Sequence, residues 1–131
     1  MSDRRRLRRL VVDDSTTYMW TIRHRHEDGT GCAEILTLHQ DGVRTRIVFR
    51  SGEGRYAGGG YPTHSGGVGD RDHHLNLHEP GTVRAFVEEA RRRGLLPHDG
   101  ELDGWELFRA VAVSRAAATT PEVPRDRPPG P

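Results

Sequence analysis

Three stretches between residues 18 and 50 alternate apolar and polar side chains, and this pattern constrains the fold more than any other feature. Tyr18, Trp20 and Ile22 alternate with Met19, Thr21 and Arg23, and residues 32–39 and 43–50 continue the alternation. A period of two places successive side chains on opposite faces of a strand. The sequence therefore predicts three strands that share one apolar face.

Two turns predict how these strands pair. Residues 27–31 are a turn-rich loop, and Asp41-Gly42 is a strong signal for a two-residue hairpin. With these turns, His24 lies opposite Glu34 and Glu34 lies opposite Phe49. The same register gathers the large apolar residues on one face, and a slip of one residue would scatter them. These residues are Trp20, Ile22, Leu36, Leu38 and Ile47.

Two helices and a short strand complete the predicted fold. Residues 75–77 read as a strand, and Pro80 is suited to the first position of a helix that ends at Gly94. A second, shorter helix is expected to begin with Asp103 as its N-cap. We therefore expect an α+β fold: an antiparallel meander sheet of three to five strands, with one longer and one shorter helix packed on its apolar face.

Composition divides the chain into three parts. Residues 1–9 hold five arginines against one aspartate, and residues 114–131 hold five of the eight prolines. We interpret these ends as a basic flexible arm and a disordered tail, which leaves residues 10–113 as a single domain. Half of the sixteen glycines fall within residues 51–69, so that segment is interpreted as a loop, either a functional lid or a floppy excursion.

Several protein classes are excluded by composition. Cys32 is the only cysteine, so a disulfide framework is excluded and a reducing, cytoplasmic compartment is expected. No run of eighteen apolar residues exists, so no membrane partner is expected.

The segment Leu75-Asn76-Leu77-His78-Glu79-Pro80, followed by Val83-Arg84, carries a family resemblance. It resembles the strand-to-helix step of small, uncharacterised bacterial α+β proteins. The Gly94 stop and the Asp103-Gly104-Trp105 run belong to the same resemblance. The resemblance implies the fold and no activity, because no function is known for that group.

The predicted polar face of the sheet carries a stripe of arginines. Its members are Arg23, Arg25, Arg44, Arg46 and Arg50. Guanidinium groups bind carboxylates and phosphates, so the expected partner is a protein or another acidic macromolecule, with nucleic acid as an alternative. Met19, Ile35 and Val48 offer no aromatic platform for stacked bases. The simplest alternative is an ordinary solvated face.

A second candidate site lies on the apolar face beyond the core. His24 and His26 are about 6.6 Å apart along a strand, and Glu34 lies opposite His24. Two histidines and a carboxylate suit zinc or iron. The alternative is an ordinary cross-strand His24–Glu34 pair.

A second histidine-rich group consists of Asp70, Asp72, His73, His74 and His78. We interpret it as a solvated loop edge, because His74 and His78 are too far apart along the chain to share one ion.

No catalytic motif is specific. Gly52-x-Gly54 mimics a dinucleotide fingerprint, yet the glycines that follow cannot open a helix. The leading hypothesis is therefore a non-enzymatic binding module that uses the arginine face. The alternative is a small metal-binding protein or metal-dependent enzyme, and a third hypothesis is a nucleic-acid-binding regulator that uses the basic N-terminal arm.

Overall fold

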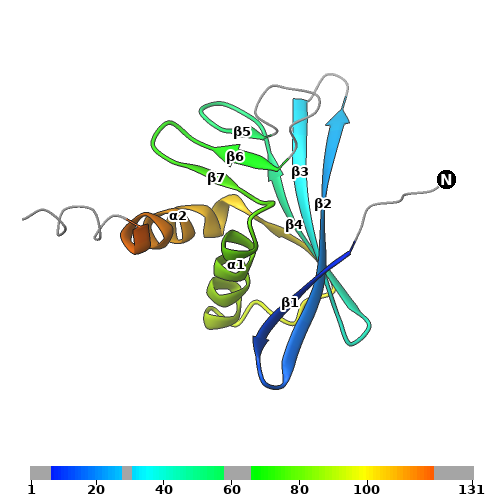
Figure 1. The fold of residues 1–131 in the computed structure, drawn as a ribbon. Helices are drawn as coiled ribbons and strands as arrows, with labels where there is room; N and C mark the ends of the chain where they lie inside the picture. Colours follow the sequence, from blue (N-terminus) through cyan, green and yellow to red (C-terminus); the bar gives the residue numbers. More distant parts are fainter. Residues whose placement is uncertain (1–6, 28–30, 58–65, 120–131) are drawn as a thin grey trace, which may run out of the picture.

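The computed structural model describes residues 7–27, 31–57 and 66–119. Within these ranges the chain forms two helices, a five-stranded, mostly antiparallel sheet and a three-stranded antiparallel sheet (Figure 1). The predicted α+β fold is therefore confirmed. None of the helices in these ranges is long and apolar enough to cross a membrane.

The large sheet has the strand order β1-β2-β3-β4-β8. Its strands are β1 (Arg8–Asp13), β2 (Thr16–Glu27), β3 (Gly31–Gln40), β4 (Val43–Arg50) and β8 (Gly100–Asp103). The first four strands form an antiparallel meander, because each follows its neighbour through a short turn. β8 returns from far along the chain and pairs in parallel with β4.

The predicted register is confirmed at every pair that the turns defined. His24 lies opposite Glu34, and Glu34 lies opposite Phe49. At the hairpin tip, Asp41 has φ 53° and Gly42 has φ 81°. A type I′ turn needs two positive φ values, which explains the Asp-Gly pair at this position.

The small sheet consists of β5 (Tyr56–Ala57), β6 (Gly67–Gly69) and β7 (His74–Asn76). The interpretation of residues 51–69 as a loop is thus wrong for residues 56–57 and 67–69, and residues 58–65 lie outside the described residues. Glycine suits the β6 strand because a Cβ on Gly69 would lie 2.4 Å from the Tyr56 hydroxyl. Val68 is fully buried, so β6 contributes to the main core.

Helix α1 (Pro80–Arg92) begins at the predicted proline, and Gly94 follows its end with φ 76°. Helix α2 (Trp105–Thr119) has fifteen residues against thirteen in α1, so the expectation of a shorter second helix is wrong. It continues past residue 113 because residues 116–118 are alanines, which favour helix. β1 likewise begins inside the segment assigned to the arm, and residues 1–6 and 120–131 lie outside the described residues.

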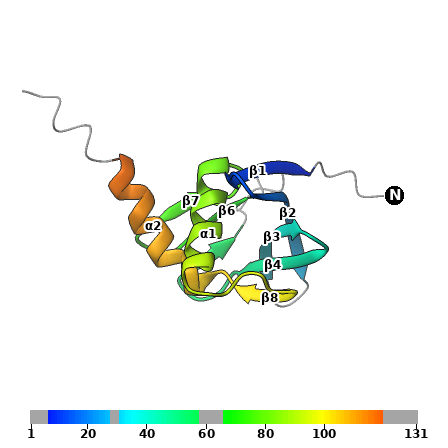
Figure 2. The same cartoon turned by 90° about the horizontal axis from the view of Figure 1, so that it is seen from below.

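Both helices and the small sheet lie on one face of the large sheet, which curves around α1 (Figure 2). In the part of the chain that the structure describes, no layer covers the other face. The core contains Trp20, Phe49 and Phe86, with Phe49 and Phe86 edge to face at 5.3 Å. Burial of such large rings is the main stabilising term for a domain of this size.

Side chains cap the edge strands of the large sheet. Arg84 on α1 donates to the carbonyl oxygens of Val11 and Val12 in β1, at 3.4 and 3.0 Å. On the other edge, His98 Nε2 donates to the carbonyl oxygen of Glu101 in β8, at 3.2 Å. Backbone acceptors on both edge strands are therefore occupied by the protein itself.

The junction between β8 and α2 provides a test of this packing. A Cβ on Gly104 would lie 2.4 Å from the buried Phe49 ring. We expect Gly104→Ala to lower the free energy of unfolding by about 1–3 kcal/mol, because Phe49 has no room to move. Urea denaturation measures this loss. Gly52→Ala is the matched control, because a Cβ there meets nothing within 4 Å; equal losses in the two variants would contradict this account.

Candidate functional site

The uncovered face of the large sheet is ordered by the strand register into rows. Each row contains one residue from β2, one from β3 and one from β4. The rows are Met19–His39–Arg44, Thr21–Thr37–Arg46, Arg23–Ile35–Val48 and Arg25–Ala33–Arg50. The five arginines predicted for this face therefore come from β2 and β4, and β3 between them carries no charged residue on this face.

This arrangement forms a groove along β3. Arg23 and Arg25 stand on one side and Arg46 and Arg50 on the other, about 10 Å apart because neighbouring strands are spaced by about 4.8 Å. A cavity of about 170 Å³ lies between them. We call it the arginine groove; its lining residues are Arg23, Arg25, Ala33, Ile35, Thr37, Arg46, Val48, Arg50 and Glu101.

The floor of the arginine groove is buried although no layer covers it. Ala33, Ile35 and Val48 are only 3%, 5% and 3% exposed and form a small apolar cluster of their own. Long arginine side chains cover apolar neighbours with their methylene groups and keep the guanidinium in water. The Arg50 side chain, for example, remains 59% exposed.

Charge in the arginine groove is only partly compensated. Glu101 of β8 lies 3.5 Å from Arg50, and both side chains are about half exposed. Arg23, Arg44 and Arg46 make no ion pair or hydrogen bond with any residue in the described ranges. Glu101 could not be predicted for this site, because nothing in the nearby sequence indicates that residues 100–103 pair with β4.

Arginines on the helical side of the molecule are paired more closely. Arg84 lies 2.9 Å from Glu88, and Glu89 lies 2.5 Å from Arg92 and 2.6 Å from Arg93. Hydrogen bonds from Arg92 and Arg93 hold the pKa of Glu89 below its usual range. Arginines without a carboxylate partner are therefore a feature of the open face of the sheet and not of the protein surface in general.

The second candidate site is built around a buried carboxylate. Glu34 is fully buried; its Oε2 atom lies 2.5 Å from Nδ1 of His24, and its Oε1 atom accepts the Gly66 N–H at 2.8 Å. Burial raises the pKa of Glu34, and the hydrogen bonds from His24 and Gly66 oppose that rise. Both oxygens of the carboxylate are thus occupied within the protein.

The structure brings together only part of the zinc or iron site predicted at His24, His26 and Glu34. His24 and Glu34 meet, while the side chain of His26 lies outside the described residues. Among the residues that the structure describes, no group of three histidine, cysteine, aspartate or glutamate side chains is arranged to hold a metal ion. The metal site stays a prediction.

The second histidine group serves local structure. Asp70 accepts the N–H groups of Asp72 and His73, both at 2.9 Å, which closes the turn before β7. His74 stacks on Tyr56, and its Nδ1 lies 2.7 Å from the tyrosine hydroxyl. Asp70, Asp72 and His73 lie in this turn, whereas His74 belongs to β7, so the interpretation as a loop edge is wrong for His74.

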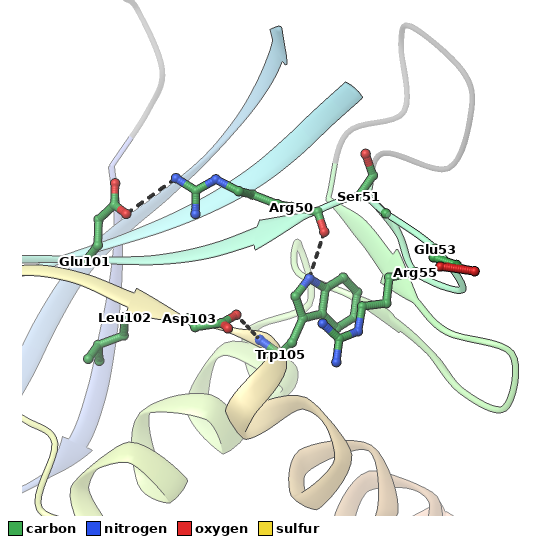
Figure 3. A pocket seen from close by; sticks show the side chains of 9 residues that line it. Arg50, Ser51, Glu53, Arg55, Glu101, Leu102, Asp103 and Trp105 are labelled. Carbon is green, nitrogen blue, oxygen red and sulfur yellow. Dashed lines mark hydrogen bonds and ion pairs between the residues drawn. The ribbon is translucent and has the colours of Figure 1, made fainter. Parts of the chain in front are cut away.

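A larger cavity of about 520 Å³ lies where the parallel strands β4 and β8 end (Figure 3). We call it the Trp105 cavity; its lining residues are Arg50, Ser51, Gly52, Glu53, Arg55, Glu101, Leu102, Asp103 and Trp105. Trp105 Nε1 donates to the carbonyl oxygen of Arg50 at 2.9 Å, and Asp103 accepts the Trp105 N–H at the start of α2. In the sequence, Trp105 was noted only in the Asp103-Gly104-Trp105 run, and this cavity was not predicted.

The contacts of Glu34 predict the effect of removing it. Glu34→Ala would leave the Gly66 N–H without its acceptor, and we expect a loss of about 1–3 kcal/mol in the free energy of unfolding. Glu34→Gln keeps an oxygen for that N–H and removes the buried charge, so its loss should be smaller. Urea denaturation of both variants at neutral pH compares them; equal losses would show that the Gly66 contact does not matter.

The raised pKa of Glu34 also predicts a pH dependence. Above pH 4.5, its usual pKa, the folded state retains the Glu34 proton more strongly than the unfolded state does. The stability from this group is therefore fully present below pH 4.5 and is lost as pH rises through the folded pKa. The free energy of unfolding of the wild-type protein should therefore fall, relative to that of Glu34→Gln, as pH rises from 4.5 through the folded pKa of Glu34. A constant difference in unfolding free energy across the range would contradict this.

Comparison with known proteins gives no assignment: no protein-family model, curated protein sequence or solved structure matches this chain. The resemblance of residues 75–84 to small bacterial proteins accordingly stays an expectation. The function has to be inferred from the geometry of the open face and of the Glu34 contacts.

Proposed function

We propose that the protein is a non-enzymatic binding module whose arginine groove holds an extended, acidic polypeptide segment. The observation that carries the proposal is the pair of arginine lines on β2 and β4, which flank a strand without charge on this face. Arg23 and Arg46 stand on opposite sides of the groove and have no carboxylate partner in the described ranges. An acidic segment would supply those partners.

The spacing of the groove suits an extended chain. Arg23 and Arg25 are separated by two residues of a strand, about 6.6 Å, which is also the spacing of alternate side chains in an extended peptide. A carboxylate at every second residue of such a peptide can therefore meet a guanidinium. Arginine and carboxylate form paired, charge-assisted hydrogen bonds, which supply both affinity and orientation.

The floor of the groove favours a polypeptide over a nucleic acid. Proteins that bind single-stranded nucleic acid combine basic residues with aromatic side chains on which bases stack. Here the floor is formed by Ala33, Ile35 and Val48, with no aromatic ring among the lining residues. A small apolar floor suits the backbone and short side chains of a peptide.

The chemistry of the groove favours binding over catalysis. Its main functional groups are guanidinium ions, which stay protonated at any physiological pH. They supply fixed positive charge and hydrogen-bond donors and do not exchange protons with a substrate. Recognition of anions is what such a surface does well.

A binding titration tests the proposal. We would measure the dissociation constant of a labelled peptide of alternating glutamate and serine by fluorescence anisotropy, at low and at physiological salt. Affinity should fall as salt rises, because exposed charges are screened. Arg23→Glu/Arg46→Glu should weaken binding by at least about tenfold, since each reversal replaces an attraction with a repulsion.

The control variant is Arg71→Glu/Arg109→Glu, which changes the net charge by the same amount. Arg71 and Arg109 are exposed, lie outside the groove and make no ion pair with any described residue. This variant should bind nearly as well as the wild-type protein. Equal weakening in the two variants, or tighter binding of a single-stranded nucleic acid that the groove variant loses, would overturn the proposal.

A further inference from the structure

We propose that the acidic segment also carries an aromatic side chain, and that this ring occupies the Trp105 cavity. This inference rests on the proposed function of the arginine groove and names the kind of peptide that the groove selects. It concerns a cavity lined by the turn after β4, by β8 and by Trp105 at the start of α2, which shares only Arg50 and Glu101 with the groove.

The two cavities are adjacent. Arg50 and Glu101 line both of them, and Figure 3 shows their ion pair at the Trp105 cavity. The two charged atoms are 3.5 Å apart, and the side chains are 59% and 47% exposed. Such exposed pairs contribute little stability, so this pair can rearrange at low cost when a ligand carboxylate approaches Arg50. A peptide that leaves the groove beside Arg50 enters the Trp105 cavity.

The charges of the Trp105 cavity select a neutral group. Its lining holds three carboxylates, those of Glu53, Glu101 and Asp103, against the two guanidinium groups of Arg50 and Arg55. A further carboxylate of the ligand would meet this acidic excess, and the Arg50 and Arg55 guanidinium groups in the same lining oppose a cationic group. Trp105 and Leu102 supply apolar surface instead. A neutral aromatic side chain fits both conditions.

Trp105 is held in place before any ligand arrives. Its Nε1–H group donates to the carbonyl oxygen of Arg50, and its ring packs edge-on against Phe49 and Phe108, with centroids 5.4 and 5.1 Å apart. A wall that is already rigid loses little conformational entropy on binding. Buried aromatic anchors in preformed pockets supply much of the affinity of peptide interfaces.

Arg55 adds a second surface for a ring. Its guanidinium lies 5.1 Å from the centre of the Trp105 ring and makes no ion pair with any described residue. A guanidinium is planar and stacks on aromatic rings. Because the Arg55 side chain is exposed, a ligand ring can stack beside it at the mouth of the cavity.

Three labelled peptides of equal length test the inference. All three have the same alternating acidic sequence between their terminal residues. The first has phenylalanine at the N-terminus, the second has phenylalanine at the C-terminus, and the third has alanine at both positions. One of the phenylalanine peptides should bind at least tenfold more tightly than the alanine peptide. Arg55→Gln should reduce this advantage, taken as the ratio of the two affinities for the same variant, at least threefold, whatever it does to the affinity of the alanine peptide. Arg71→Gln, the matched control, should change neither quantity.

The two tryptophans give an independent readout. In protein labelled with 5-fluorotryptophan, the ¹⁹F NMR signal of Trp105 should shift with the phenylalanine peptide, while that of Trp20, which is 1% exposed, should not. Trp105→Phe shows which of the two ¹⁹F signals belongs to Trp105. If that variant does not fold, the effect of Arg55→Gln on the advantage of the phenylalanine peptide still decides whether the ring binds in the Trp105 cavity.

Failure of this inference can be told apart from failure of the proposed function. If the alanine peptide binds and the Arg23→Glu/Arg46→Glu variant loses it, but phenylalanine gives no advantage and the Trp105 signal stays fixed, only the aromatic ligand is refuted. If none of the three peptides binds, the acidic partner is refuted as well.

Discussion

The register between β2, β3 and β4 is the constraint on which the rest of the structure depends. Successive side chains of a strand point to opposite faces, so the pairing that buries Leu36 and Ile47 also places Ile35 and Arg46 on the open face. A slip of one residue would turn the arginines toward the core, where an unpaired charge is very costly. The hydrophobic core thus fixes the positions of the guanidinium groups in the groove.

Local signals in the sequence were sufficient for this part of the molecule. Asp41-Gly42 defines one hairpin, the loop at residues 27–31 defines the other, and alternation does the rest, so the strand pairing and the rows of arginines could be predicted. Helix α1 was equally accessible, because Pro80 and Gly94 mark its ends. All these signals act between residues that are close in sequence.

Long-range pairing could not be predicted in the same way. β8 has four residues and one apolar side chain, Leu102, and it pairs with a strand more than fifty residues earlier. Without β8, neither Glu101 nor the cavity beside Trp105 could be placed. The contact between Gly66 and Glu34 is another example, since it joins the small sheet to the large one across thirty-two residues. The length of α2 could not be predicted for a different reason: the prolines after residue 120 are typical of disorder, and the alanines at 116–118 have no apolar periodicity that would indicate a helix.

The capped edges of the large sheet have a consequence for assembly. A bare edge strand recruits other extended chains, whether a ligand strand or a second misfolding molecule. Here Arg84 and His98 already bind carbonyl oxygens of β1 and β8. Addition of a sixth strand would have to displace them. These three contacts therefore make edge-to-edge association of two sheets less favourable.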